Sequence, residues 1–328
     1  MSTNGFQFHK AVREQIRLLI ALSGGTGSGK SFSALRLAKG LSNGKRFAAV
    51  DTENGRLSMY ADFFDFDVVN LTAPFTPERY TQAILAAQSS GYDVILVDSG
   101  SHEWDGDGGV LDAQAEELDM MVERSKKSGD NRRDWEIEDS HRMRSWIRPK
   151  MEHKRMMTHL LQLKAHVIMC LRAAEKIEIR KNEKGKTEVV PKQSLTGLDG
   201  WIPICEAKLP FEFTASFLLT ADKPGFPKPI KLQEQHKAFF PLDKPITEDA
   251  GRLIGEWARG GAKPADQPKA EAYDAKSILA KIESATDMDA TWAWLKTVVF
   301  PAGPDKTLAV ECYKARKKQL AQKEPLEI

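Results

Sequence analysis

The feature that most constrains this chain is a glycine-rich loop between an apolar run and a helical pattern. Residues 16–23, IRLLIALS, are typical of a buried strand, and residues 31–41, SFSALRLAKGL, indicate a helix that ends near Gly40. Between them, residues 24–31 read GGTGSGKS and match G-x-x-x-x-G-K-[ST] in full. Glycines let backbone amides wrap around an anion, and the following helix adds the positive end of its dipole. The pattern therefore predicts a phosphate-binding loop at a strand-to-helix turn.

Each part of this loop has an expected role toward ATP and Mg²⁺. The Lys30 ammonium can reach the β- and γ-phosphates, and the Ser31 hydroxyl can ligate Mg²⁺. The other loop residues are expected to hold the phosphates through their amides: Gly24, Gly25, Thr26, Gly27, Ser28 and Gly29. The alternative is a flexible glycine turn without a ligand, which the full motif and its strand–helix context disfavour.

Strand and helix patterns alternate along the chain after this loop. Strands are expected at 46–51, 66–71, 92–98 and 165–171, and helices at 76–91, 108–127, 151–163 and 246–257. Such alternation predicts an α/β fold with a mainly parallel central sheet flanked by helices. Three further segments are expected to be an exposed charged stretch at 130–139, a hairpin at 177–190, and short strands within 207–240 that include LPFEFTASFLLTAD.

Composition and chain punctuation set the domain organisation. The 328 residues are 41% hydrophobic and 29% charged, which is typical of a globular protein with a buried core. We expect a main domain at 1–258, a linker rich in Gly, Pro and Ala at 259–271, and a small helical domain at 272–328. The three cysteines are far apart and predict neither a disulfide framework nor a metal site. With no signal peptide and no long apolar run, a cytoplasmic location is expected, and no membrane partner.

Two carboxylates follow predicted strands and are expected to meet the phosphates. Asp98 ends the apolar strand YDVILVD, where a P-loop protein places the acid that holds Mg²⁺. Glu53 follows the strand RFAAVD and can orient or deprotonate a water at the same sheet edge, although a solvated loop acid is the alternative. Ser99 is expected either to hydrogen-bond near the γ-phosphate or to cap the end of its strand.

These motifs together resemble a known family. GGTGSGKS, VDTENG and VILVDS resemble the RecA/RadA-type ATPase core, in which the glutamate after the second strand is the catalytic base, the place that Glu53 occupies. VDSGSHEWDGDGG, HVIMCLRAAEK and the segment ending in KLQEQH are similar to phage-encoded RecA-core ATPases, some associated with single-strand annealing and recombination. The resemblance covers about residues 16–258. It implies a RecA-like P-loop ATPase with Lys30, Glu53 and Asp98 in catalysis.

A local excess of positive charge suggests a DNA surface. Residues 141–190 hold thirteen Lys and Arg but five Asp and Glu, whereas the whole chain carries a net charge of +2. The strand at 165–171 is expected to neighbour the one that ends at Asp98, which would put Arg172 near the γ-phosphate or at the root of a DNA loop. In the resembled core, the segment after this strand binds DNA. The expected single-stranded DNA contacts are Arg172, Lys176, Arg180, Lys181, Lys184 and Lys186, and the alternative is a solvated hairpin.

Three functions fit the sequence. The first is a DNA-stimulated ATPase of recombination or annealing, which is expected to form a homo-oligomer and to act with a single-strand-binding or recombination partner protein. The second is a P-loop kinase of a nucleotide or small molecule, and the third is an ATP-gated partner-binding protein without significant turnover. His102, Glu103 and Trp104 follow Asp98 closely. Glu103 could compete with Glu53 as the base, and His102 could sense the γ-phosphate, but we expect these residues to serve structure or coupling rather than catalysis.

Overall fold

The structure, a computed structural model, describes residues 16–181, 187–194, 197–198, 200–260, 275–295 and 305–321. The chain divides into two units, Met1–Gly261 and Ala262–Ile328, each with its own internal contacts. The first unit contains the glycine-rich loop, and the described residues of the second form three helices. The expected linker, 259–271, begins at the last residue of the final helix of the first unit, and its residues 261–271 lie outside the described residues.

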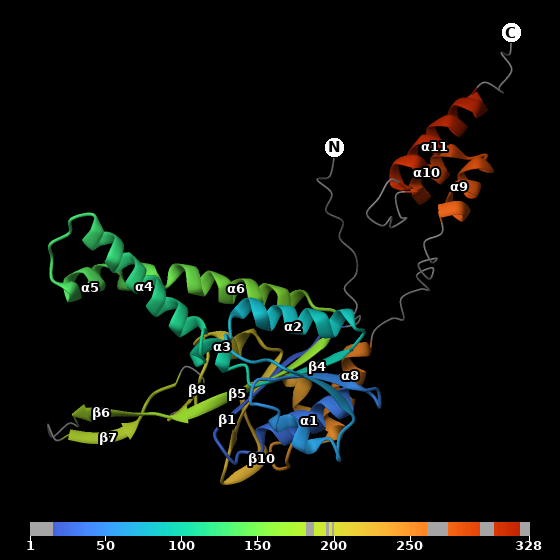
Figure 1. Cartoon of the computed structure of the whole chain (residues 1–328). Helices are drawn as coiled ribbons and strands as arrows, with labels where there is room; N and C mark the ends of the chain where they lie inside the picture. The colour runs from blue at the N-terminus through green and yellow to red at the C-terminus, as the bar shows by residue number, and fades with distance from the viewer. Residues whose placement is uncertain are drawn as a thin grey trace. The chain divides into compact units, whose positions relative to one another are not determined.

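A mainly parallel sheet lies at the centre of the first unit (Figure 1). Its strand order is β10-β9-β1-β5-β4-β2-β3, with β8 paired to the end of β5. All pairs from β9 to β3 are parallel, while β10 and β8 pair antiparallel with their neighbours. The strands are β1 Leu19–Gly24, β2 Phe47–Asp51, β3 Phe66–Asn70, β4 Val94–Asp98, β5 His166–Glu175, β8 Trp201–Pro203, β9 Ala215–Thr220 and β10 Lys223–Lys231. The predicted α/β architecture is confirmed, and β5 is the neighbour of β4 as expected.

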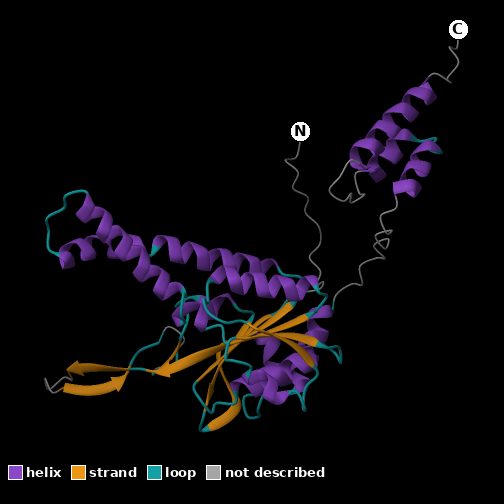
Figure 2. Cartoon of the chain, viewed as in Figure 1, coloured by secondary structure: helices purple, strands orange, loops and turns teal. Residues whose placement is uncertain are grey.

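Helices cover both faces of this sheet (Figure 2). Alternate residues of β1 point to opposite sides, so Ile20 packs in the core under α1 Lys30–Leu41 and α8 Glu248–Arg259. Ala21 packs in the other core, under α2 Pro77–Ser89 and α6 Ile147–Gln162. Burial on both faces explains why the central strands are continuous apolar runs. The carboxyl ends of the parallel strands therefore form one edge on which polar loop residues can meet.

The contact between α1 and α8 requires glycine. A Cβ on Gly40 would lie 1.8 Å from the carbonyl oxygen of Glu248, a distance that no side chain can occupy. The Arg36–Glu248 ion pair, 2.7 Å long, lies at the same helix contact. The helix that begins at the glycine-rich loop is thus fixed against the C-terminal helix of the first unit.

Two extensions leave the sheet beyond β4 and β5 (Figure 1). The first contains α3 His102–Asp105, α4 Val110–Lys127, α5 Asp134–Ser145 and part of α6. The second is a two-stranded antiparallel ribbon of β6 Ile177–Lys181 and β7 Thr187–Pro191, which confirms the expected hairpin.

The charged stretch at 130–139 is mostly exposed, as expected, and leads into α5, which packs on α4 and buries Ile137. One local expectation differs from the structure. Residues expected as strand at the start of LPFEFTASFLLTAD form the short helix α7 Leu209–Glu212, with Pro210 in its first turn, where the missing N–H costs nothing. Short 3₁₀ helices occur at η1 Arg56–Tyr60 and η2 Glu234–Phe239.

The second unit contains α9 Ala275–Glu283, α10 Met288–Leu295 and α11 Asp305–Ala321. Ile282, Leu295 and Ala309 form its small core, and Trp292 lies against Tyr313 with ring centroids 4.8 Å apart. Across the described residues of the chain, none of the helices combines the length and apolar character needed to cross a membrane.

Candidate functional site

The glycine-rich loop forms the turn from β1 to α1. Gly29 is the N-cap of α1 with a φ of 76°, a left-handed conformation that favours glycine, and no side chain caps the helix there. A Cβ on Gly29 would also lie 2.9 Å from the Gly225 amide nitrogen at β10. The Ser28 hydroxyl donates to the Gly25 carbonyl at 2.8 Å and closes the loop on itself. The first amides of α1 are therefore left for a ligand.

Asp98 lies at the end of β4, beside the start of α1. Its side chain is buried and hydrogen-bonded to Ser31, with Lys30 close enough to act on its charge. Burial raises the pKa of Asp98, and the nearby carboxylates of Glu53 and Asp51 add to that rise, whereas Lys30 and Ser31 oppose it. A buried carboxylate with a serine hydroxyl and other acids nearby is a donor set that suits a hard cation.

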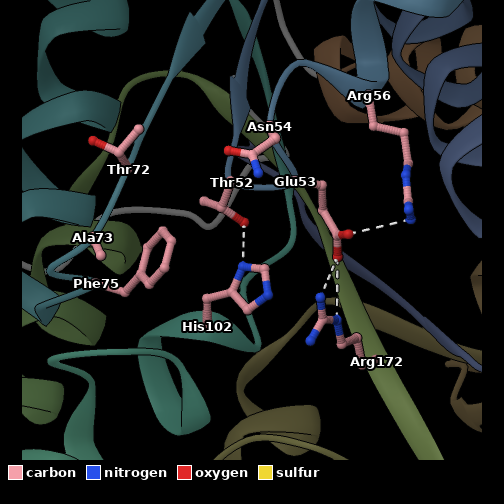
Figure 3. Close-up of a pocket in the computed structure, with 9 residues that line it drawn as sticks. All are labelled: Thr52, Glu53, Asn54, Arg56, Thr72, Ala73, Phe75, His102 and Arg172. Atoms are coloured by element: carbon pink, nitrogen blue, oxygen red, sulfur yellow. Dashed lines mark hydrogen bonds and ion pairs between the residues drawn. The ribbon is translucent and has the colours of Figure 1, made fainter.

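Glu53 faces the same cavity as Lys30 and is held by two arginines (Figure 3). Arg172, in β5, donates from Nε and Nη2 to Glu53 Oε1 at 3.1 and 2.9 Å. Arg56 donates to Glu53 Oε2 at 3.2 Å. Burial would raise the pKa of Glu53, but the hydrogen bond and charge of Arg172 outweigh it and hold that pKa below its usual value. Glu53 is therefore an ionised carboxylate in this arrangement.

Asp51 builds the loop that carries Glu53. It is fully buried at the end of β2, in register with Asp98 of β4. Its Oδ1 accepts from the Glu53 amide at 2.6 Å, and its Oδ2 accepts from the Leu57 amide at 2.8 Å. Both carboxylate oxygens are thus used to fix the turn from Glu53 to the start of η1.

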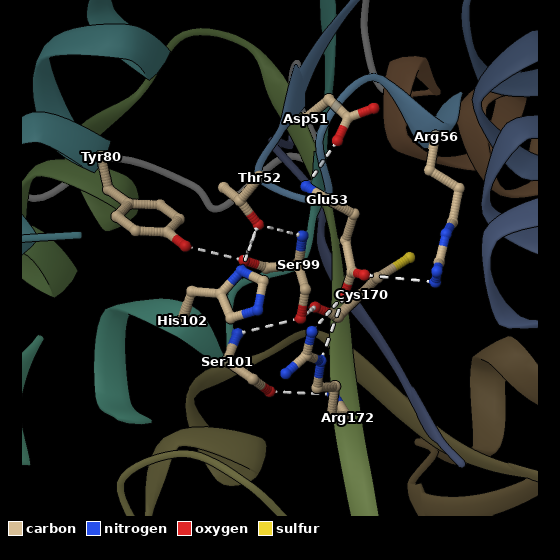
Figure 4. Close-up of polar contacts among 10 residues, drawn as sticks. All are labelled: Asp51, Thr52, Glu53, Arg56, Tyr80, Ser99, Ser101, His102, Cys170 and Arg172. Carbon is tan, nitrogen blue, oxygen red and sulfur yellow. Dashed lines mark hydrogen bonds and ion pairs between the residues drawn. The ribbon is translucent and has the colours of Figure 1, made fainter. Parts of the chain in front are cut away.

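Ser99 lies beneath the cavity in a buried network and does not line it (Figure 4). Its amide donates to Thr52 Oγ1 at 2.8 Å, its carbonyl accepts from the Tyr80 hydroxyl at 2.7 Å, and its own hydroxyl accepts from the Ser101 amide at 3.1 Å. This arrangement favours the strand-end alternative for Ser99 over the phosphate contact. The Ser101 hydroxyl in turn accepts from the Arg172 amide at 2.8 Å, which ties β5 to the loop after β4.

Glu103 and Trp104 point away from Glu53, into the contact with α6. Glu103 Oε1 lies 2.9 Å from His153 Nδ1, and both side chains are buried. Burial disfavours a charged imidazole, but the hydrogen bond and charge of Glu103 outweigh that effect and raise the pKa of His153. Trp104 stacks on Trp146 with ring centroids 6.0 Å apart. These contacts fit the structural or coupling role expected from the sequence.

The residues expected to contact DNA are spread along β5 and the ribbon. Arg172 lines the cavity with the glycine-rich loop, and Lys176 lines a separate cavity of about 510 Å³ with Lys192 and Trp104. Arg180 is paired with Glu178, and Lys181 is exposed at the end of β6. Lys184 and Lys186 lie outside the described residues.

The glycine-rich loop, Glu53 and Arg172 enclose a cavity of about 620 Å³. Its open amides, Lys30 and Arg172 fit a polyphosphate, and Ser31 with Asp98 fits Mg²⁺ between protein and phosphate oxygens. Among the described residues, no cluster of three or more His, Cys, Asp or Glu side chains forms a metal cage. That result is compatible with Mg²⁺, which is usually held by few carboxylates plus substrate phosphates.

Sequence reasoning missed three residues of this cavity. Phe32 and Tyr60 line it with ring centroids 5.9 Å apart, and they offer aromatic surface that a nucleoside base can contact. Arg56 lines it opposite Arg172. The available signal for Arg56 was the Asn54-Gly55 turn, in which both residues have positive φ and return the chain toward Glu53.

Comparison with known proteins agrees with this geometry. A family model described as an AAA domain matches residues 16–200, which include the glycine-rich loop, Glu53, Asp98 and Arg172. None of the curated proteins compared with the chain matches it. Because the matched segment covers more than half of the chain and holds the whole phosphate site, the chain belongs to the AAA domain family of P-loop ATPases.

Proposed function

We propose that this protein hydrolyses ATP in the cavity around Lys30 and uses the cycle to act on single-stranded DNA. The proposal of ATP hydrolysis rests on one cavity that is lined by the P-loop, Glu53 and Arg172. An AAA domain suggests nucleotide binding and hydrolysis in general.

The chain's residues divide the chemistry among them. The loop amides and Lys30 bind the phosphates, and Ser31 and Asp98 hold Mg²⁺, which neutralises charge on the phosphate oxygens. Glu53 orients a water and accepts its proton, a role that requires its carboxylate to leave Arg172 at least in part. Arg172 is then available to stabilise negative charge on the transferred phosphoryl group.

The proposal of DNA binding rests on β5 and the ribbon. The same strand that carries Arg172 into the cavity continues through Lys176 to the ribbon with Arg180 and Lys181. Arg172 and the ribbon therefore belong to one continuous stretch of chain, so a movement of Arg172 during hydrolysis can reach the ribbon through the backbone of β5. One ribbon face is apolar and exposed, with Ile179 opposite Val189 at 71% and 61% exposure, so it offers surface to bases as well as charge to phosphates.

We also propose a homo-oligomer that acts in recombination or annealing of the phage type, with a single-strand-binding or recombination protein as its partner. Edge strand β3 supports a contact between copies, because Val68 and Val69 are exposed there at 40% and 48%. Met59 and Phe63, next to it in η1 and the following turn, are more than two-thirds exposed. The recombination role itself is supported by the family resemblance of the motifs.

The test is phosphate release from ATP with and without single-stranded DNA, using Lys30→Ala as the inactive control. We expect turnover that DNA stimulates, and loss of ATP affinity in Lys30→Ala measured by calorimetry. Unchanged ATP binding by Lys30→Ala would refute the site. Phosphate transfer that needs an added acceptor metabolite would favour a kinase, and tight ATP binding with negligible turnover would favour an ATP-gated binding protein.

A further inference from the structure

A second cavity of about 460 Å³ adjoins the nucleotide cavity (Figure 3). Glu53, Arg56 and Arg172 line both cavities, so these three side chains form the wall between them. The second cavity contains no residue of the P-loop. Its other lining residues follow β2, follow β3 or belong to α3. The second cavity therefore lies on the far side of this wall from the P-loop.

Hydrogen-bond donors dominate the lining of this second cavity. Arg56, Arg172, Asn54 and Thr72 all carry side-chain N–H or O–H groups. Glu53 is the one acid among the described residues that line it, and it is already bound to both arginines. The lining thus carries a net positive charge and suits an anion with several acceptor oxygens.

His102 lines the same cavity and is tied to a buried hydrogen-bond network (Figure 4). Thr52 Oγ1 accepts from the Ser99 amide at 2.8 Å, donates to the Ser99 carbonyl at 3.1 Å, and lies 2.7 Å from His102 Nδ1. This network fixes one side of the imidazole ring.

The ring of His102 is also held in place and kept neutral. It stacks on Phe75 with centroids 4.9 Å apart, and Nε2 faces the side of Glu53 and Arg172 in Figure 3. Burial lowers the pKa of His102, and the charge of Arg172 lowers it further. The His102 ring is therefore a positioned polar group at the edge of the second cavity.

We propose that the second cavity binds inorganic phosphate, and that it receives the phosphate cleaved from ATP before its release. This inference rests on the proposed hydrolysis of ATP. Phosphate offers four oxygens to the N–H donors of Arg56, Arg172 and Asn54, and it forms on the other side of the wall that contains both arginines. Phosphate bound there competes with Glu53 for the two arginines, so it delays the return of Glu53 to the ion pair seen in the structure.

The first arm of the test measures phosphate binding without turnover. Calorimetric titration of potassium phosphate into the full-length, ADP-loaded protein compares the wild type with Asn54→Asp, which adds a like charge beside the anion. Asn54 has a φ of 60°, and aspartate tolerates that conformation. The matched control is Asn43→Asp, because Asn43 has a φ of 54° in the turn after α1, and this described residue lines neither cavity.

We expect binding to the wild type and to Asn43→Asp, and binding at least about tenfold weaker to Asn54→Asp. Thr72→Val, which removes one donor at an exposed position, should weaken binding by a smaller factor. No phosphate binding by the ADP-loaded wild type, or equal binding by the two aspartate variants, would overturn the proposal. Because this arm needs no hydrolysis, its failure is distinct from failure of the ATPase assignment.

The second arm asks whether the phosphate comes from ATP. In a single turnover, quenched samples report hydrolysis and a fluorescent phosphate-binding probe reports release. We expect release to lag behind hydrolysis in the wild type and in Asn43→Asp, and the lag to shorten in Asn54→Asp. Simultaneous hydrolysis and release in the wild type would overturn the assignment to product phosphate.

Discussion

Arg172 holds the Glu53 carboxylate through two hydrogen bonds to the same oxygen, Oε1, at 3.1 and 2.9 Å. The two residues are 119 positions apart in the chain; Glu53 follows the end of β2, and Arg172 lies within β5, level with the end of β1. The pair occupies the wall that the nucleotide cavity shares with the second cavity. The proposed role of Glu53 as the base requires its carboxylate to leave this ion pair.

Glu53→Gln should keep ATP binding and slow hydrolysis by at least ~100-fold, the usual worth of a general base. The amide keeps the shape of the side chain but cannot accept a proton. Single-turnover hydrolysis and calorimetric ATP binding check both parts. Glu116→Gln, at an exposed position of α4, is the matched control and should hydrolyse ATP normally. A near-normal rate in Glu53→Gln would move the base elsewhere.

Arg172→Gln should shift the acid limb of the hydrolysis rate to higher pH as well as lower the rate. Arg172 holds the pKa of Glu53 below its usual value, against the effect of burial, so removing the guanidinium lets that pKa rise. Glu53 is then protonated, and inactive as a base, at a higher pH than in the wild type. Rate profiles from acid to neutral pH measure the shift, with folding monitored by circular dichroism at each pH.

Arg56→Gln is the comparison for that experiment. Arg56 is 66% exposed, bonds to the other oxygen of Glu53 at 3.2 Å, and has the smaller influence on the pKa of Glu53. The acid limb of the hydrolysis rate should shift to higher pH by less in Arg56→Gln than in Arg172→Gln. Equal shifts, or none in either variant, would contradict the role given to Arg172.

Neutralising the ribbon should flatten the salt dependence of single-stranded DNA binding. Replacing Arg180, Lys181, Lys184 and Lys186 with glutamine removes up to four phosphate contacts, and each is worth roughly 0.7 in the slope of log K against log salt. Fluorescence anisotropy over a salt series measures that slope. Glutamine at Lys314, Lys317 and Lys318 of α11 tests a basic cluster in the second unit. An unchanged slope in the ribbon variant would exclude the ribbon as the site that contacts single-stranded DNA.

His166→Asn should make the free energy of unfolding less sensitive to acid. His166 is buried at the start of β5 and its Nδ1 accepts from the Leu18 amide at 3.0 Å. Burial, then Arg17 and Arg259, lower its pKa to about 4. In the unfolded chain His166 becomes protonated near pH 6.5, whereas in the folded chain it stays neutral until the pH is about 4. The folded state therefore loses stability as the pH falls from 6.5 toward 4.

That loss amounts to about 2–3 kcal/mol near pH 4.5 in the wild type. Asparagine can accept the same amide hydrogen bond without titrating, so the variant should lack this part of the acid sensitivity. Denaturant unfolding at neutral and acid pH measures the difference. The exposed His159→Asn, on α6, should behave like the wild type, and equal acid sensitivity in all three proteins would contradict the prediction.

Gly40→Ala should destabilise the first unit by about 3 kcal/mol or more, as overpacking of a close helix contact does. The new methyl group would meet the Glu248 carbonyl at 1.8 Å, and α1 would have to move away from α8. Because α1 starts at the P-loop, ATP affinity should fall as well. Lys39→Ala, an exposed neighbour on the same helix, should leave unfolding and affinity nearly unchanged.

The sequence by itself determined the fold class and the phosphate loop, because both depend on local patterns. The spacing of GGTGSGKS, the apolar runs that end in Asp51 and Asp98, and the alternation of strands with helices each lie within a few residues. Their expected sheet is present, with β5 between β1 and β4. The short helix α7 was missed since its residues, LPFE, have apolar character that a strand shares.

Only the tertiary structure decided which charges meet across the sheet edge. The Glu53–Arg172 pair, the burial of Glu103 against His153, and the second cavity behind Arg56 join segments tens of residues apart. The sequence left Glu53 and Glu103 as alternative bases because both are acids near strand ends. Strand order and helix packing separate them, since they place one carboxylate at an open sheet edge and bury the other beneath α6.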